Sequence, residues 1–121
     1  MRVELVKEFT FEAAHRLPRV PADHKCARMH GHSFRVEVAV EGEIDPAMGW
    51  LVDYAELTAV VDPLLKNELD HRCLNDVPGL ENPTSEIVCT WLWQRLQPVL
   101  PGLSRITLAE TCTARCTYLG R

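Results

Sequence analysis

The chain has 121 residues, with 46% hydrophobic residues, 25% charged residues and a formal net charge of −4 at pH 7. These values are typical of one soluble domain, residues 1–121, that is large enough to bury its own core. They give no electrostatic reason to expect nucleic acid or an anionic membrane as a partner, and the lack of a long apolar run or signal peptide predicts a cytoplasmic protein.

Alternating apolar and polar residues predict a first strand over about residues 2–14. Because successive side chains point to opposite faces of a strand, the odd-numbered apolar residues share a face with His15. These residues are Val3, Leu5, Phe9, Phe11 and Ala13. We therefore expect the His15 imidazole to lie on the side of the strand that faces the core.

A loop with two prolines follows the first strand. Its residues 16–28 carry four basic side chains against one acidic residue, Asp23; the basic residues are Arg16, Arg19, Lys25 and Arg28. Such a loop can receive an anionic substrate, and it is equally compatible with a solvated loop of scattered charge.

A second strand is predicted over about residues 31–43, again from alternation. Its apolar residues share parity with His30 and His32; they are Phe34, Val36, Val38 and Val40. Both imidazoles are thus expected on the core side of the sheet. Residues 45–49 after the strand have the composition of a turn.

Two helices are predicted next. The first covers about residues 54–68, with Asp53 as N-cap, Glu56 in a box-like spacing and Pro63 expected to kink the helix or divide it into two pieces. The second covers about residues 84–98, with Asn82 and Thr84 both plausible N-caps. Two further strands over about residues 104–112 and 115–119 complete the chain.

This order of elements indicates an α+β fold in which two helices cover one face of a four-stranded antiparallel sheet. The two edges of such a sheet have unpaired backbone groups, which can pair with another subunit unless they are blocked. We therefore expect a closed oligomer.

Three histidines, His15, His30 and His32, are the candidate metal ligands. Three imidazoles on converging faces offer three nitrogens and leave a fourth position free, the arrangement of a catalytic zinc. The alternative is three core histidines satisfied by hydrogen bonds. His71 competes with His15 as the third ligand, because any neutral imidazole can bind the metal.

Cys26 is a candidate reactive thiol. It lies next to Lys25 and close to Arg28 and the histidines, and positive charge favours the thiolate, so it can act as a nucleophile or general base. The alternative is a small buried hydrophobic residue. Spacing alone does not separate these two interpretations.

Two further groups are candidates for chemistry. A carboxylate can orient an imidazole for proton transfer, which suits Asp70 and His71, although adjacent residues in a strand face opposite ways and an ordinary polar loop is the alternative. Glu110 shares parity with buried strand residues, so its carboxylate either forms a salt bridge to Arg105 or Arg115 or accepts two N–H groups from a heterocycle.

These residues belong to stretches that match a known family almost along the whole chain: 9–17, 26–32, 49–53, 69–71, 74–76, 78–86 and 110–112. The chain resembles the 6-pyruvoyltetrahydropterin synthase superfamily, and within it the 6-carboxy-5,6,7,8-tetrahydropterin synthases of queuosine (7-deazaguanine) biosynthesis. The spacing of Cys26 to the His30-Gly31-His32 motif is specific to that branch.

The resemblance implies the tunnelling fold, in which a four-stranded antiparallel sheet carries two helices on one face. Three subunits would close a twelve-stranded β-barrel, and two trimers would stack into a homohexamer. Active sites would then lie between subunits, which explains why no single segment reads as a complete pocket.

The resemblance also implies a zinc-dependent lyase. It would convert 7,8-dihydroneopterin triphosphate into 6-carboxy-5,6,7,8-tetrahydropterin with loss of acetaldehyde and triphosphate. The histidines matching His15, His30 and His32 would bind Zn²⁺, and Cys26 would abstract a proton. Asp70 and His71 would form the second proton-transfer unit, and Glu110 would anchor the pterin ring. Triphosphate binding by Arg16, Lys25 or Arg28 is a hypothesis.

Two alternatives remain at this point. The sister activity, 6-pyruvoyltetrahydropterin synthase, uses the same zinc, thiol and proton relay but keeps the side-chain carbons attached. A non-catalytic, zinc-stabilised binding or oligomerisation module needs neither Cys26 nor the Asp70-His71 pair, and its zinc would be closed by a fourth protein ligand.

Overall fold

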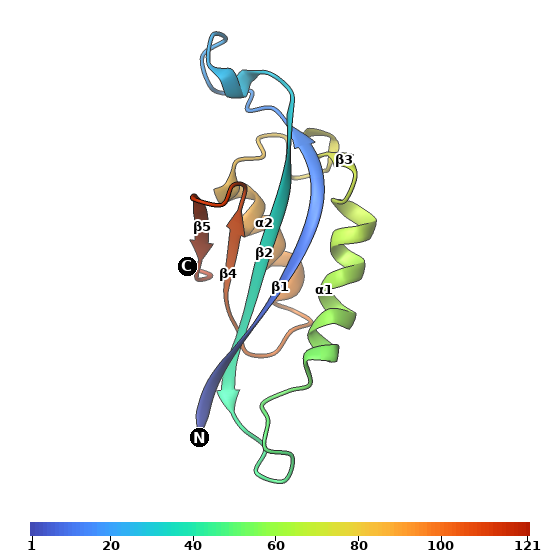
Figure 1. The fold of residues 1–121 in the computed structure, drawn as a ribbon, viewed down its shortest axis with the longest axis vertical. Helices are drawn as coiled ribbons and strands as arrows, with labels where there is room; N and C mark the ends of the chain where they lie inside the picture. The colour runs from blue at the N-terminus through green and yellow to red at the C-terminus, as the bar shows by residue number, and fades with distance from the viewer.

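The computed structural model describes residues 1–121 as one sheet with two helices (Figure 1). Two long strands come first and are followed by the first helix, a short strand, the second helix and two C-terminal strands. Their bounds are β1 Arg2–His15, β2 His30–Glu43, α1 Tyr54–Glu68, β3 Arg72–Cys73, α2 Ser85–Leu96, β4 Leu103–Ala109 and β5 Arg115–Tyr118, with short 3₁₀ turns at Lys25–Ala27 and Leu74–Asp76.

The sheet has five strands in the order β3-β1-β2-β4-β5 and is mixed, so the prediction of a purely antiparallel, four-stranded sheet is wrong. The additional strand, β3, runs parallel to β1 and pairs only with Ala13 and Ala14. Two residues are too few for an alternating pattern, and this pairing joins segments that are far apart in the chain. The α+β class and the other four strands are as predicted.

The pairing of β1 with β2 places the core on one face of the sheet. Phe11 lies opposite Phe34 and Phe9 opposite Val36, and all four are buried. Residues between them, such as Thr10 and Glu12, are exposed on the other face. The predicted alternation is therefore confirmed in both strands, and it carries the histidines to the core side.

Helix α1 begins after Asp53, whose carboxylate accepts a hydrogen bond from the Ala55 N–H, as the sequence predicts. It runs unbroken through Pro63, so the expected division into two pieces is wrong. Proline removes one backbone N–H, but the buried face on either side of it keeps the helix on the sheet. The buried residues of this face are Leu57, Val61 and Leu65.

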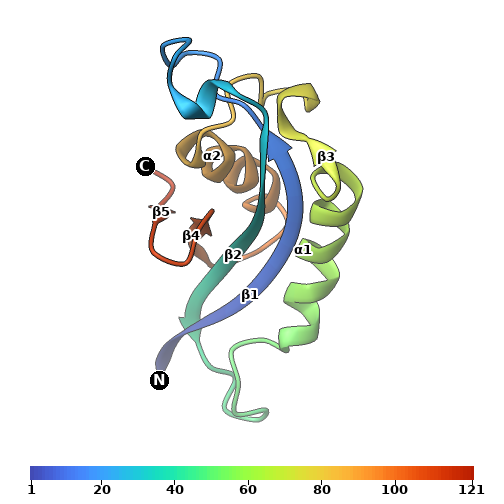
Figure 2. The ribbon, with the colours of Figure 1, turned by 45° about the horizontal axis from the view of Figure 1, so that its top comes forward.

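Helix α2 begins after Thr84, whose hydroxyl accepts from the Ile87 N–H, which decides between the two candidate N-caps. It ends at Leu96, two residues before the predicted end. Side chains from both helices join one hydrophobic core with the inner face of the sheet. Figure 2 shows the two helices beside the sheet. No helix of the chain has the length and apolar character needed to cross a membrane.

Candidate metal centre and its surroundings

The strand register brings the three predicted histidines together at one end of the sheet. His15 is paired with His30, and Ala13 with His32, so all three imidazoles lie on the core face of adjacent strands. Their potential ligand atoms all lie within 4.8 Å of one another. His71 does not belong to this cluster, so the competition for the third position is decided in favour of His15.

Backbone carbonyls orient two of these imidazoles. Nδ1 of His15 lies 2.9 Å from the Pro83 carbonyl oxygen, and Nδ1 of His30 lies 2.8 Å from the Arg28 carbonyl oxygen. Because a carbonyl only accepts, both Nδ1 atoms carry the proton, and both Nε2 atoms keep a free lone pair. Metal-bound histidines are typically held in this way.

The Nε2 atoms of His15 and His32 are buried without any hydrogen-bond partner. A buried, unsatisfied polar atom costs about 1–3 kcal/mol, so two of them in one cluster fit a site that binds a metal ion. Burial also lowers the pKa of His15, and the neighbouring His30 and His32 lower it further. The Pro83 carbonyl and Glu110 act in the opposite direction and raise this pKa. The neutral imidazole that a metal requires is therefore favoured, and the residues fit a three-histidine metal site.

Glu110 lies beside this cluster rather than in a salt bridge with arginine. Its Oε2 is 3.8 Å from Nε2 of His32, and its Oε1 accepts a hydrogen bond of 2.9 Å from the Ser85 hydroxyl. Arg105, one of the expected partners, pairs instead with Glu4 at 2.9 Å. The half-buried carboxylate is thus held next to the metal ligands, and Ser85, which sequence reasoning missed, is one of its supports.

Asp70 and His71 contact each other, contrary to the concern that neighbouring side chains would diverge. Asp70 Oδ2 lies 3.0 Å from His71 Nδ1, and Asp70 Oδ1 accepts from the Glu12 N–H at 2.8 Å. The Glu12 N–H and the His71 side chain lower the pKa of Asp70. The carboxylate is therefore ionised and able to orient the His71 imidazole, which is largely exposed.

The contact depends on an unusual backbone conformation of His71, whose φ is 59°. This left-handed conformation is costly for residues with a Cβ and free for glycine. We expect His71→Gly to be more stable than His71→Ala by about 1 kcal/mol, while both lose the imidazole. Urea unfolding of the two variants measures this difference, and equal midpoints would show that the backbone here is unstrained.

The Cys26 thiol lies in the 3₁₀ turn of the loop between β1 and β2, which stands above the histidine end of the sheet (Figure 1). The residue is half-buried and its thiol is free. The three basic candidates Arg16, Lys25 and Arg28 are exposed around this loop. The structure thus leaves them accessible to an anionic group.

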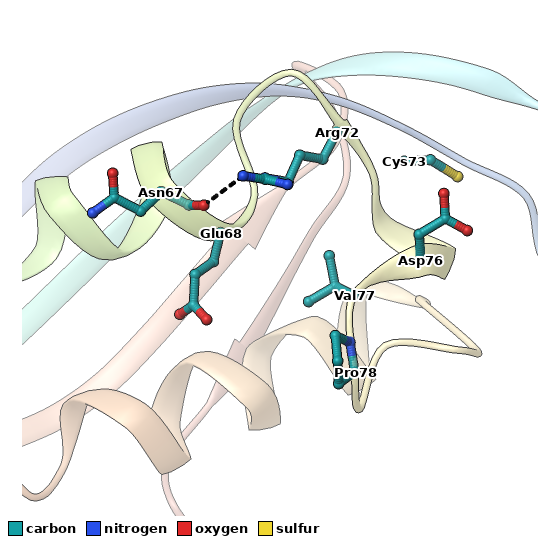
Figure 3. A pocket seen from close by; sticks show the side chains of 7 residues that line it. All are labelled: Asn67, Glu68, Arg72, Cys73, Asp76, Val77 and Pro78. Atoms are coloured by element: carbon teal, nitrogen blue, oxygen red, sulfur yellow. Dashed lines mark hydrogen bonds between the residues drawn. The ribbon is translucent and has the colours of Figure 1, made fainter.

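An open cleft of about 640 Å³ adjoins the metal cluster. Both His32 and His71 line it, so the second proton-transfer candidate and a metal ligand face a shared space. A neighbouring cavity of about 420 Å³ shares Arg72 and Cys73 with this cleft but contains none of the histidines. Figure 3 shows Arg72 reaching back to the Asn67 carbonyl at 2.9 Å, where its guanidinium covers the end of α1.

Comparison with known proteins adds independent information. A profile of the family described as 6-pyruvoyl tetrahydropterin synthase matches residues 4–121. A Synechocystis protein named 6-carboxy-5,6,7,8-tetrahydropterin synthase is 44% identical over 119 residues, which cover 94% of this chain and 91% of that protein. A Pyrococcus furiosus protein named dihydroneopterin monophosphate aldolase is 38% identical, with 91% of each chain covered.

A solved structure resembles the fold closely. The 6-pyruvoyl tetrahydropterin synthase of Caenorhabditis elegans superposes with a TM-score of 0.90 at 30% identity, covering 100% of this chain and 97% of that chain. The sheet and the two helices are therefore arranged here as in a protein of known structure.

Proposed function

Because the chain belongs to the 6-pyruvoyl tetrahydropterin synthase family, we propose that it catalyses the 6-carboxy-5,6,7,8-tetrahydropterin synthase reaction. This lyase reaction converts 7,8-dihydroneopterin triphosphate into the carboxytetrahydropterin and releases acetaldehyde and triphosphate, a step of queuosine biosynthesis. The observation that carries the proposal is the cluster of three histidines with two unpartnered Nε2 atoms beside Glu110. The whole chain, residues 1–121, acts as a single pterin-synthase domain in this proposal.

The metal in this proposal is Zn²⁺, held by His15, His30 and His32. Three imidazoles with an open fourth position match a catalytic zinc better than a structural one, which is closed by four protein ligands. When bound, zinc would act as a Lewis acid toward the side-chain hydroxyl oxygens of the pterin. The Pro83 and Arg28 carbonyls accept hydrogen bonds from Nδ1 of His15 and His30, which leaves Nε2 as the ligand nitrogen of each ring.

Proton transfer is assigned to Cys26 on one side of the substrate and to the Asp70-His71 pair on the other side. Cys26 is the proposed acceptor of a proton from the substrate side chain, and Lys25 and Arg28 lie one and two residues from it in the loop. Asp70 holds and orients the His71 imidazole through the 3.0 Å contact. His71 lines the same cleft as the proposed metal ligand His32, which supports its part of this assignment.

Substrate recognition is assigned to Glu110 and the basic loop. The Glu110 carboxylate can accept hydrogen bonds from the pterin amino group and ring N–H while Ser85 holds one of its oxygens. Arg16, Lys25 and Arg28 are the proposed triphosphate contacts, since their exposed cations flank the histidine end of the sheet. The contribution of each of these three residues to triphosphate binding is part of the proposal.

We further propose a homohexamer of two trimers with active sites between subunits, acting in the cytoplasm. The open edges of the sheet support the oligomer: β3 covers β1 only at Ala13 and Ala14, and β5 forms the opposite edge. The exposure of the His71 side chain supports a site completed by a neighbouring copy. All five cysteines are free thiols, which a reducing compartment would preserve.

Mass spectrometry of the products formed from 7,8-dihydroneopterin triphosphate by zinc-loaded protein tests the proposed activity. We expect 6-carboxy-5,6,7,8-tetrahydropterin and acetaldehyde in equal amounts. A product that retains the pyruvoyl side chain would move the protein to the sister activity with the same site. Turnover of dihydroneopterin monophosphate alone would favour the aldolase relative, and no turnover by folded, metal-loaded protein would leave only a binding module.

A further inference from the structure

The side chain of Asn75, in the 3₁₀ turn Leu74–Asp76, continues the pairing of β1 beyond the end of β3. Its Oδ1 accepts a hydrogen bond from the Arg16 N–H at 3.0 Å, and its Nδ2 donates to the Arg16 carbonyl at 2.9 Å. One amide thus satisfies both backbone groups of one residue, as a neighbouring strand would. β3 itself pairs only with Ala13 and Ala14.

The residue that Asn75 holds is the junction between the metal site and the thiol loop. Arg16 directly follows His15, the last residue of β1. The next residue, Leu17, donates its N–H to the Cys26 carbonyl at 2.8 Å. This is the one backbone hydrogen bond that joins the Cys26 turn to the end of β1, since the others in the loop lie within residues 21–28.

A third contact of Asn75 reaches the segment that orients His15. Nδ2 lies 3.4 Å from the Glu81 carbonyl oxygen, two residues before Pro83, whose carbonyl accepts from His15 Nδ1. Asn75 also lies four residues after His71 in the same segment. Its amide therefore links the three segments that carry the metal ligand His15, the thiol and the proton-transfer pair.

We propose that Asn75 is a positioning residue that holds the Cys26 loop in register with the metal histidines. It touches none of the reacting groups itself, and it acts through the Arg16 backbone and the Leu17–Cys26 hydrogen bond. The role of Cys26 in this inference rests on the proposed function. The alignment of the loop does not rest on the proposed function, because it is a property of the folded chain.

Asn75→Ala and Asn75→Asp test this, with Asn67→Ala as matched control because the Asn67 side chain is exposed and makes no hydrogen bond. In Asn75→Ala we expect the Leu17 amide to exchange with deuterium at least about tenfold faster, while the buried Val36 amide is unchanged. The rate of Cys26 alkylation, measured relative to that of the exposed Cys112 by peptide mass spectrometry, should change as well. Asn75→Asp keeps the hydrogen bond from the Arg16 N–H. Its exchange and alkylation rates should therefore lie between those of the wild type and those of Asn75→Ala.

Kinetics add a readout that a merely structural residue would not move. We expect kcat to fall about 10–100-fold with KM within about threefold and with metal content retained, because misplacement of a reacting group by about 1 Å has an effect of this size. The Asn67→Ala control should match wild type in every measurement.

Unchanged Leu17 exchange and Cys26 alkylation in Asn75→Ala would overturn the proposal. Equal loss of protection at Leu17 and Val36 would also overturn it, since Asn75 would then stabilise the whole fold rather than the loop. If Asn75→Ala does not fold, Asn75→Asp decides by the same comparison. If wild-type protein fails to turn over the pterin, the proposed function fails, while exchange and alkylation still decide the role of Asn75.

Discussion

Replacement of His15 by alanine should abolish stable metal binding and reduce turnover of 7,8-dihydroneopterin triphosphate by about a thousandfold or more. A Lewis-acid metal contributes several kcal/mol to the transition state, and each 1.4 kcal/mol corresponds to about a factor of ten in rate. His15 is fully buried, and its Nε2 has no hydrogen-bond partner. Its loss removes one of only three available donors.

Metal content after dialysis, together with initial rates, measures this effect. The matched control is His24→Asn, because His24 lies outside the cluster and an amide oxygen can still accept from the Cys26 N–H as Nδ1 of His24 does at 3.0 Å. This control should retain one metal per chain. A His15→Ala protein that still binds one metal tightly would contradict the three-histidine site.

Chelation separates a catalytic metal from a structural one. With an open fourth position, removal of the metal should abolish activity while far-ultraviolet circular dichroism changes little, since the core forms without the metal; the unfolding midpoint should fall, but the protein should stay folded. The core cluster of 22 buried residues contains none of the histidines, which supports this expectation. Unfolding on chelation would instead indicate a structural zinc and favour the binding-module alternative.

Replacement of Cys26 by alanine should lower kcat by about 10²–10⁴-fold with the metal retained, the usual contribution of a positioned general base. The thiol makes no hydrogen bond that stabilises the fold; only its backbone groups are bonded, to His24 and Leu17. Stability should therefore change little. The effect should appear in kcat rather than KM, because a proton acceptor acts on the transition state.

Cys112→Ala is the control for this variant, since Cys112 is an exposed free thiol in the turn before β5. It should keep full activity, and iodoacetamide should inactivate the wild type and the Cys112→Ala variant alike. Full turnover by metal-loaded Cys26→Ala would show that another group accepts the proton. Loss of metal from the same variant would place the thiol among the ligands instead.

The sequence was sufficient for the parts of the site that depend on local periodicity. Alternation over residues 2–14 and 31–43 predicted that His15, His30 and His32 share the core face, and the register confirms it. The cap of α1 was equally readable, because Asp53 bonds to an N–H group two residues away, whereas for α2 the sequence left Asn82 and Thr84 as alternatives and the structure selects Thr84. Such contacts are determined within a few residues of chain.

The contacts that the sequence did not reveal join segments far apart in the chain or depend on a single backbone angle. Asp70 meets His71 because His71 takes a positive φ, which neither residue type predicts with any strength. Ser85 supports Glu110 across 25 residues, and Asn75 binds Arg16 across 59. No periodicity signals these pairs.

The sequence by itself therefore determined the α+β class, the four strands other than β3, both helices and the candidate metal ligands His30 and His32, while it left His15 and His71 as alternatives for the third ligand. The tertiary structure decided that the sheet has a fifth, parallel strand, that α1 continues through Pro63, and that Asn75 joins the strand end to the thiol loop. The physical reason is the range of the interactions. Side-chain alternation and capping are local, whereas a two-residue parallel pairing and a side chain that bonds a distant backbone exist only once the chain has folded.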